Sequence, residues 1–161
     1  MNTFSADEIY QMAQQIERDG AGYYRKAAQF FPEKEQKKLF EKLAKMEDKH
    51  LEQFTEMRNE LQDETTDVVY DVDGQAEVYL RAIAEDKVFD VKSDPADYIK
   101  PDSSVVDILK KAIELEKNSI IFYIGLKDLV PTKGGKRKIE AIIQQETRHI
   151  VMLTTEIAKK S

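Results

Sequence analysis

The sequence predicts an all-α protein: a four-helix bundle made of two repeated helical hairpins, joined by a long crossover that contains a short helix. Over four long segments, apolar residues recur every three to four positions, which is the spacing of one helical face. Residues of the first half recur in the second half at a constant offset of 99 positions, as in Tyr24 and Tyr123 or Pro32 and Pro131. Two related pairs of amphipathic helices are expected to bury their apolar faces against each other.

The first hairpin is expected over about residues 5–61. Its first helix starts near Ser5, a residue type that caps helix N-termini, and ends at Phe31. Pro32 separates the two helices and can open the second, because proline is tolerated in the first helical turn. The apolar stripe of the second helix runs from Phe40 to Leu61.

The crossover is expected over about residues 62–102. A structureless loop of this length is unusual in a compact domain, so we expect it to be partly helical and packed along the bundle. A long connection also allows the second and third helices to run parallel. Residues 75–87 predict the short helix, and its apolar side is expected to carry Val78, Tyr79, Ala82 and Ile83.

The second hairpin is expected over about residues 103–160. Its first helix begins near Ser103 or Ser104, and Pro131 with Gly134-Gly135 breaks the pattern before the last helix. At this size, residues 1–161 are expected to form a single domain.

Composition narrows the range of functions. The net charge is −6 and charged residues make up 35% of the chain, so we expect no basic face for nucleic acid. No apolar run approaches a membrane span and the N-terminus lacks a signal pattern, so we expect a cytoplasmic protein without a membrane partner. The absence of cysteine excludes disulfides, thiol catalysis and thiolate-bound metals. Carboxylate and imidazole remain as possible metal ligands.

Charged residues stand inside the apolar stripes at six positions. Each half has a lone glutamate followed by a Glu-x-x-His motif, and these motifs contain the only two histidines of the chain. Ionised carboxylates that face a core are costly unless they are paired or bind a metal, and four of them together repel one another. Two metal ions would remove this conflict. The predicted ligands are Glu17, Glu47, His50, Glu116, Glu146 and His149.

This ligand set is the one used by dinuclear carboxylate sites in helical bundles. We expect one histidine per metal, bridging roles for the two glutamates of the Glu-x-x-His motifs, and terminal roles for Glu17 and Glu116. Glu114 competes with Glu116, but residues two apart point to nearly opposite helical faces, and both the repeat and the apolar stripe favour Glu116. No catalytic residue beyond the metal ligands is predicted.

Two further pairs of residues lie near the predicted ligands. Tyr24 and Tyr123 each follow a terminal glutamate by seven residues, so their hydroxyls either donate to ligand carboxylates or belong to ordinary core aromatics. Gly20 and Ser119 either leave room for a small oxidant or allow close helix packing. For this second pair, packing is the favoured interpretation.

These motifs resemble the rubrerythrin branch of the ferritin-like superfamily. The resemblance implies a ferritin-like fold and a non-haem centre of two iron ions whose diferrous state reduces hydrogen peroxide or dioxygen. It also implies a homodimer. Manganese or mixed pairs suit the same ligands. The resembling stretches are Ile16-Glu17-Arg18-Asp19-Gly20 with Tyr23-Tyr24, Glu47-x-x-His50, Leu115-Glu116-Lys117-Asn118-Ser119 with Phe122-Tyr123, and Glu146-x-x-His149.

The sequence departs from rubrerythrins proper in two respects. Without cysteine it has no rubredoxin-like iron site, so electrons are expected from an external donor protein. The additional glutamate ligand of rubrerythrins is not evident one turn from Glu116, where Ile113 and Ser119 stand. A ferroxidase or iron-handling protein, or a non-catalytic metal-binding sensor, therefore stays as an alternative to the peroxidase or oxidase.

Overall fold

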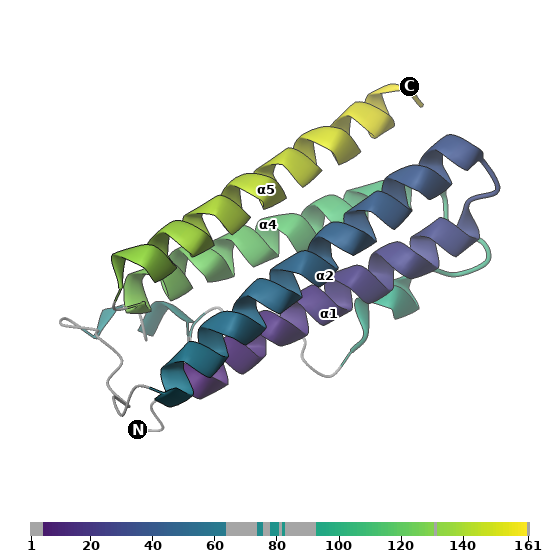
Figure 1. Cartoon of the computed structure of the whole chain (residues 1–161). Helices are drawn as coiled ribbons and strands as arrows, with labels where there is room; N and C mark the ends of the chain where they lie inside the picture. Colours follow the sequence, from purple (N-terminus) through teal and green to yellow (C-terminus); the bar gives the residue numbers. More distant parts are fainter. Residues whose placement is uncertain are drawn as a thin grey trace.

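Four long helices form the bundle (Figure 1). The computed structural model describes residues 5–63, 74, 75, 78–80, 82, 93–130 and 132–160. α1 and α2 form one antiparallel hairpin, α4 and α5 form the other, and α2 runs parallel to α4. This confirms the predicted bundle of two hairpins. The elements are α1 (Ala6–Phe30), α2 (Lys34–Asp63), the short 3-10 helix η1 (Pro95–Tyr98), α4 (Val105–Leu129) and α5 (Lys133–Ala158).

Side-chain caps start three of the four long helices. Ser5 accepts a hydrogen bond from the Glu8 amide, and the Glu8 carboxylate accepts one from the Ser5 amide at 2.8 Å, which completes a capping box. Ser104 caps α4 and Thr132 caps α5 in the same way. The predicted start near Ser5 is therefore confirmed, and of the two serines considered for α4, Ser104 is the cap.

Two expectations about helix boundaries were wrong. α2 begins at Lys34 and not at Pro32, because Phe31 and the two residues after it leave the helical path. Gly134 and Gly135 lie inside the first turn of α5 and not in the break before it. A Cβ on Gly135 would lie 2.5 Å from Val130 Cγ1, so the close approach of the chain requires glycine there.

The apolar core is divided into two clusters by a polar layer across the middle of the bundle. One cluster contains Phe54 and Tyr123, whose ring centroids are 5.0 Å apart. The other contains Phe31 and Phe40, whose rings stack at 5.1 Å. The ligand positions predicted from the sequence fall between these clusters on every long helix, so the apolar packing on both sides fixes their height along the bundle.

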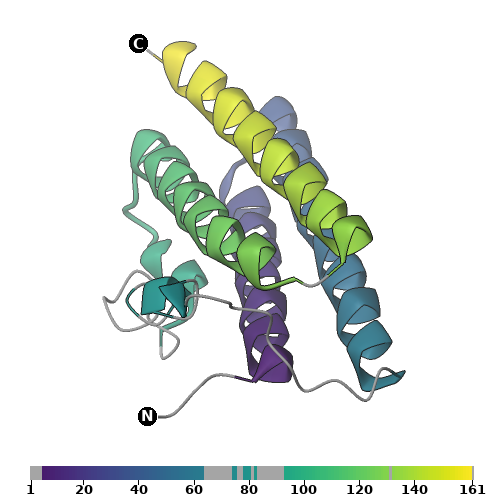
Figure 2. The same ribbon diagram turned by 90° about the vertical axis from the view of Figure 1, so that its left-hand side faces the viewer.

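The crossover helix is described only at residues 75, 78–80 and 82, which are helical (Figure 2). The expected apolar side was wrong for Val78, which is 68% exposed, and for Ala82, which is also exposed. Tyr79 is 38% exposed but lies against α4 as expected, and Leu80, which was not predicted to face the bundle, is only 1% exposed. Leu80 and the Tyr79 ring lie over Gly125 of α4, and Tyr79 donates to the Ile121 carbonyl at 2.9 Å. Ile83 lies outside the described residues.

After the crossover, the short helix η1 packs against α1. The sequence pattern did not predict η1. Asp94 caps it, and the Lys26 ammonium donates to the Ala96 carbonyl at 2.7 Å. Among the helices that the structure describes, none is long and apolar enough to cross a membrane.

Candidate metal centre

The six predicted ligands meet in the polar layer at the centre of the bundle. They form two groups whose ligand atoms lie within 4.8 Å of one another, and Glu47 and Glu146 belong to both groups. Glu17 and His50 complete one group, and Glu116 and His149 complete the other. All six side chains are buried. The structure therefore brings together one residue from each of α1 and α4 and two from each of α2 and α5.

Both imidazole rings turn the same nitrogen towards the carboxylates. His50 Nδ1 lies 2.9 Å from Glu146 Oε1, and His149 Nδ1 lies 2.9 Å from Glu146 Oε2. Glu47 also approaches both rings, at 3.3 Å from His50 Nδ1 and 3.2 Å from His149 Nδ1. Two nitrogen donors and four carboxylates thus surround one small volume.

The four carboxylates in this volume differ in how strongly they hold a proton. Burial and repulsion from Glu47 and Glu146 raise the pKa of Glu17 and Glu116 well above the usual value. Burial alone would also raise the pKa of Glu47, but contacts with the two imidazoles outweigh it and lower that pKa. For His50 burial opposes protonation, yet the surrounding carboxylates raise its pKa. Protons therefore balance the buried carboxylates when no cation does so.

The donor set fits two divalent metal ions. Despite their short distances from the imidazoles, both oxygens of Glu146 and Oε1 of Glu47 are buried without a hydrogen bond. Burying carboxylate oxygens without hydrogen-bond donors is costly in free energy. Coordination of a metal ion would give these oxygens a partner. The four negative charges of the carboxylates also equal the charge of two divalent cations. Carboxylate with imidazole is a ligand combination that suits iron and manganese.

Each buried tyrosine reaches across to the glutamate of the opposite hairpin. The Tyr24 hydroxyl on α1 donates to Glu116 on α4, and the Tyr123 hydroxyl on α4 donates to Glu17 on α1. Burial and the neighbouring carboxylates raise the pKa of both hydroxyls, so both keep their protons. The repeat locates the tyrosines, but the sequence alone does not show that their partners are exchanged between the hairpins.

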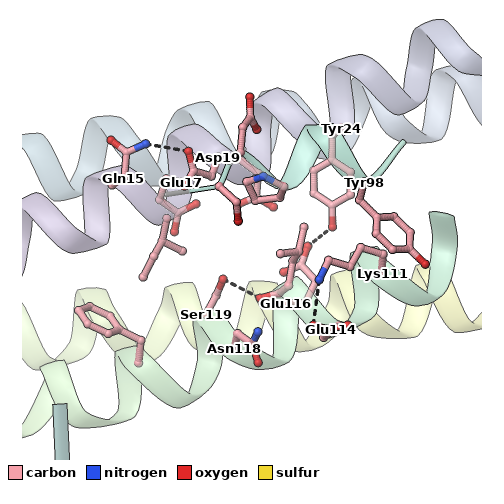
Figure 3. A pocket seen from close by; sticks show the side chains of 18 of the residues that line it. Gln15, Glu17, Asp19, Tyr24, Tyr98, Lys111, Glu114, Glu116, Asn118 and Ser119 are labelled. Carbon is pink, nitrogen blue, oxygen red and sulfur yellow. Dashed lines mark hydrogen bonds and ion pairs between the residues drawn. The ribbon is translucent and has the colours of Figure 1, made fainter. Parts of the chain in front are cut away.

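A cavity of about 370 Å³ opens beside the centre, between α1, α4 and η1 (Figure 3). Glu17 and Glu116 enter it from opposite walls, and Gly20 and Ser119 also line it. A Cβ on Gly20 would lie 3.5 Å from Glu47 Cγ, which is an ordinary contact distance, so close packing does not require glycine at this position. Glu114 lies at the cavity margin with its side chain 59% exposed, paired with Lys111 at 2.9 Å.

Sequence reasoning missed one residue that touches the centre. Gln145 Oε1 lies 2.9 Å from His50 Nε2, on the side of the ring that faces away from the carboxylates. Its position directly before Glu146 could have drawn attention to it. The repeat gave no help, because Met46 occupies the equivalent position in the first half.

Fold and site together define a ferritin-like protein with a buried carboxylate and histidine cluster compatible with a di-iron site. A family model described as rubrerythrin matches residues 8–157, and the chain belongs to this family. Among solved structures, the chain is similar to one described as a ferritin-like diiron-carboxylate protein from Thermotoga maritima. The two share 24% identity with a TM-score of 0.75 over 100% of this chain and 99% of the other, which supports the fold. No curated protein matches.

Proposed function

We propose that this protein is a non-haem di-iron oxidoreductase that reduces hydrogen peroxide, or dioxygen, with electrons from an external donor. The observation that carries the proposal is the pair of overlapping ligand groups beside an open cavity. Membership of the rubrerythrin family supports the substrate class.

We infer the ligand roles from the way the groups overlap. Glu47 and Glu146 belong to both groups, as bridging carboxylates would. His50 and His149 would each bind one metal through Nδ1, and Glu17 and Glu116 would be terminal ligands. When bound, two ferrous ions would supply the two electrons that, together with two protons, convert one hydrogen peroxide molecule to two water molecules.

The protein's own groups hold the ligands and admit the oxidant. Tyr123 and Tyr24 donate to Glu17 and Glu116 and so fix the orientation of these carboxylates. A water-sized molecule occupies about 30 Å³ in the liquid, so a peroxide molecule fits easily into a cavity of about 370 Å³. The apolar clusters on both sides of the polar layer exclude water from the rest of the core.

The test is anaerobic loading with ferrous iron, metal counting, and stopped-flow absorption after mixing with peroxide or dioxygen in separate experiments. Two irons per chain and faster oxidation by peroxide would support the peroxidase, and faster oxidation by dioxygen would support the oxidase. A protein that binds two irons and reacts with neither oxidant would contradict the proposal. Parallel loading with manganese would identify the metal that binds more tightly.

A second candidate, a ferroxidase or iron-handling protein, is favoured by the acidic margin of the cavity. Asp19, Asp94, Asp97 and Glu114 line it, against the single cation Lys111 among the lining residues. An acidic margin raises the local concentration of cations. In an experiment without an external electron donor, a ferroxidase should oxidise many ferrous ions per chain. Under the same condition, the peroxidase should stop after one turnover.

A further inference from the structure

The outer ring nitrogens of the two histidines have different surroundings. His50 Nε2 lies 2.9 Å from the carbonyl oxygen of the Gln145 side chain. His149 Nε2 is buried and has no hydrogen-bonding partner in the described parts of the chain. At the offset of the repeat, the residue equivalent to Gln145 is Met46, which precedes Glu47 in α2 as Gln145 precedes Glu146 in α5. A thioether is only a weak acceptor.

This difference affects how well each ring can bind a metal. An acceptor on Nε2–H keeps the proton on that nitrogen and leaves the lone pair of Nδ1 directed at the carboxylates. It also fixes the orientation of the ring and makes Nδ1 a stronger donor, and losing such a partner typically lowers metal affinity about 10- to 100-fold. His50 has this support from Gln145, and His149 lacks it.

We propose that the two metal positions are inequivalent, with Gln145 as the positioning residue that makes the His50 position fill first. The expected difference in affinity is about 10- to 100-fold, the range typical for loss of a hydrogen bond behind a histidine ligand. At limiting metal, the protein should carry one ion next to His50 and none next to His149. When both positions are filled, the ion next to His149 should exchange more readily than the ion next to His50. The inference rests on the proposed ligand assignment but not on any reaction with peroxide.

The test is a titration of metal-free protein with Co²⁺, in which calorimetry and visible absorption record each binding step. Wild-type protein should bind two ions in separate steps. His149→Ala should keep the tight step, and His50→Ala should keep only the weak one. Gln145→Met, which copies the first half of the repeat, should weaken the tight step about 10- to 100-fold. Gln145→Glu retains a side-chain oxygen that can accept a hydrogen bond from His50 Nε2, so this variant should preserve the tight step.

The repeat also supplies a reciprocal variant. Met46→Gln gives α2 the residue that α5 has, so the weak step should tighten until the two steps merge. Circular dichroism of each metal-free variant checks that the helices are intact. Equal affinities in the wild type, or a tight step unchanged in Gln145→Met, would overturn the inference. A protein that binds Co²⁺ in two steps but does not react with peroxide when loaded with iron would contradict only the proposed function.

Discussion

At the residue scale, the most informative contacts are the hydrogen bonds from Tyr24 to Glu116 and from Tyr123 to Glu17. Each tyrosine and its glutamate belong to opposite hairpins, so neither hairpin has a complete site of its own. Burial together with neighbouring carboxylates raises the pKa of Glu17 and Glu116, which shows that the folded protein bears a cost for placing them here. Such a cost is typical of positions that serve function rather than stability.

This cost predicts opposite effects of one substitution on binding and on stability. Glu116→Gln keeps the shape of the side chain but removes a buried acid, so the metal-free protein should be as stable as wild type or more stable. Metal content should fall from two ions to one or none. Elemental analysis and urea unfolding would measure both quantities.

The neighbouring residue Glu114 provides the matched control for Glu116. It was weighed as the alternative ligand, and its side chain is 59% exposed and paired with Lys111. Glu114→Gln should retain two metal ions and leave stability within about 0.5 kcal/mol of wild type. Loss of metal in Glu114→Gln, together with full binding in Glu116→Gln, would reverse the ligand assignment.

At the element scale, a polar network joins the start of α1 to the end of α2. Arg58 Nη2 donates to Asp7 Oδ2 at 2.9 Å, and Arg58 Nη1 donates to Gln14 at 3.0 Å. The hydrogen bonds from Arg58 lower the pKa of Asp7 from its usual value of 3.8. A lowered folded-state pKa means that this stabilisation is present above about pH 3.9, where Asp7 is ionised, and is lost as the pH falls through the folded-state value.

Asp7→Asn should therefore reduce the free energy of unfolding at neutral pH by about 0.2–1 kcal/mol, the range for partly exposed ion pairs. The difference from wild type should shrink as the pH falls below about 3.9. Urea unfolding at both pH values would measure it, with the exposed Glu52→Gln as control. A difference that grows on acidification would contradict this role for Asp7.

Two helical glycines give a second prediction about elements. A Cβ on Gly125 would lie 2.5 Å from Tyr79 Cδ1 and 2.9 Å from Leu80 Cδ2. Apart from the nearby backbone of α1 itself, no atom of the described residues lies within 4 Å of a Cβ on Gly22. Gly125→Ala should push the crossover helix off α4 and cost about 1–3 kcal/mol. Gly22→Ala should stabilise α1 by about 0.5–1 kcal/mol. Thermal unfolding would compare them, and equal effects would show that Gly125 is not a contact site.

The long helices could be predicted from local periodicity, and the six clustered residues from a repeat whose offset is constant along the chain. The packed side of the crossover helix could not, since it depends on the space over Gly125 in a helix far along the chain. The exchange of tyrosine partners and the contact of Gln145 with His50 likewise depend on how two hairpins pack. Local pattern specifies each helical face but not the residue that it meets.

At the scale of the whole molecule, the site doubles as a connection between the hairpins. α1 packs closely against α2 and α4 against α5, whereas the two hairpins pack less closely against each other. The cavity between α1 and α4 removes further contact between the halves. Much of what joins the hairpins at mid-height is therefore the polar layer, in which each proposed metal position takes ligands from both halves.

Metal loading should consequently stabilise the whole bundle and not only the site. Binding to the folded state alone adds about 2.7 kcal/mol per site when free metal is 100-fold above the dissociation constant. We expect the melting temperature to rise on anaerobic addition of ferrous iron and to return after chelation, because the metal-free polar layer keeps buried carboxylates that only protons neutralise. Glu116→Gln should show little of this rise. If wild-type protein bound two ions and melted at the same temperature as the metal-free form, the metals would not join the hairpins, and the apolar clusters on either side of the polar layer would alone hold the bundle together.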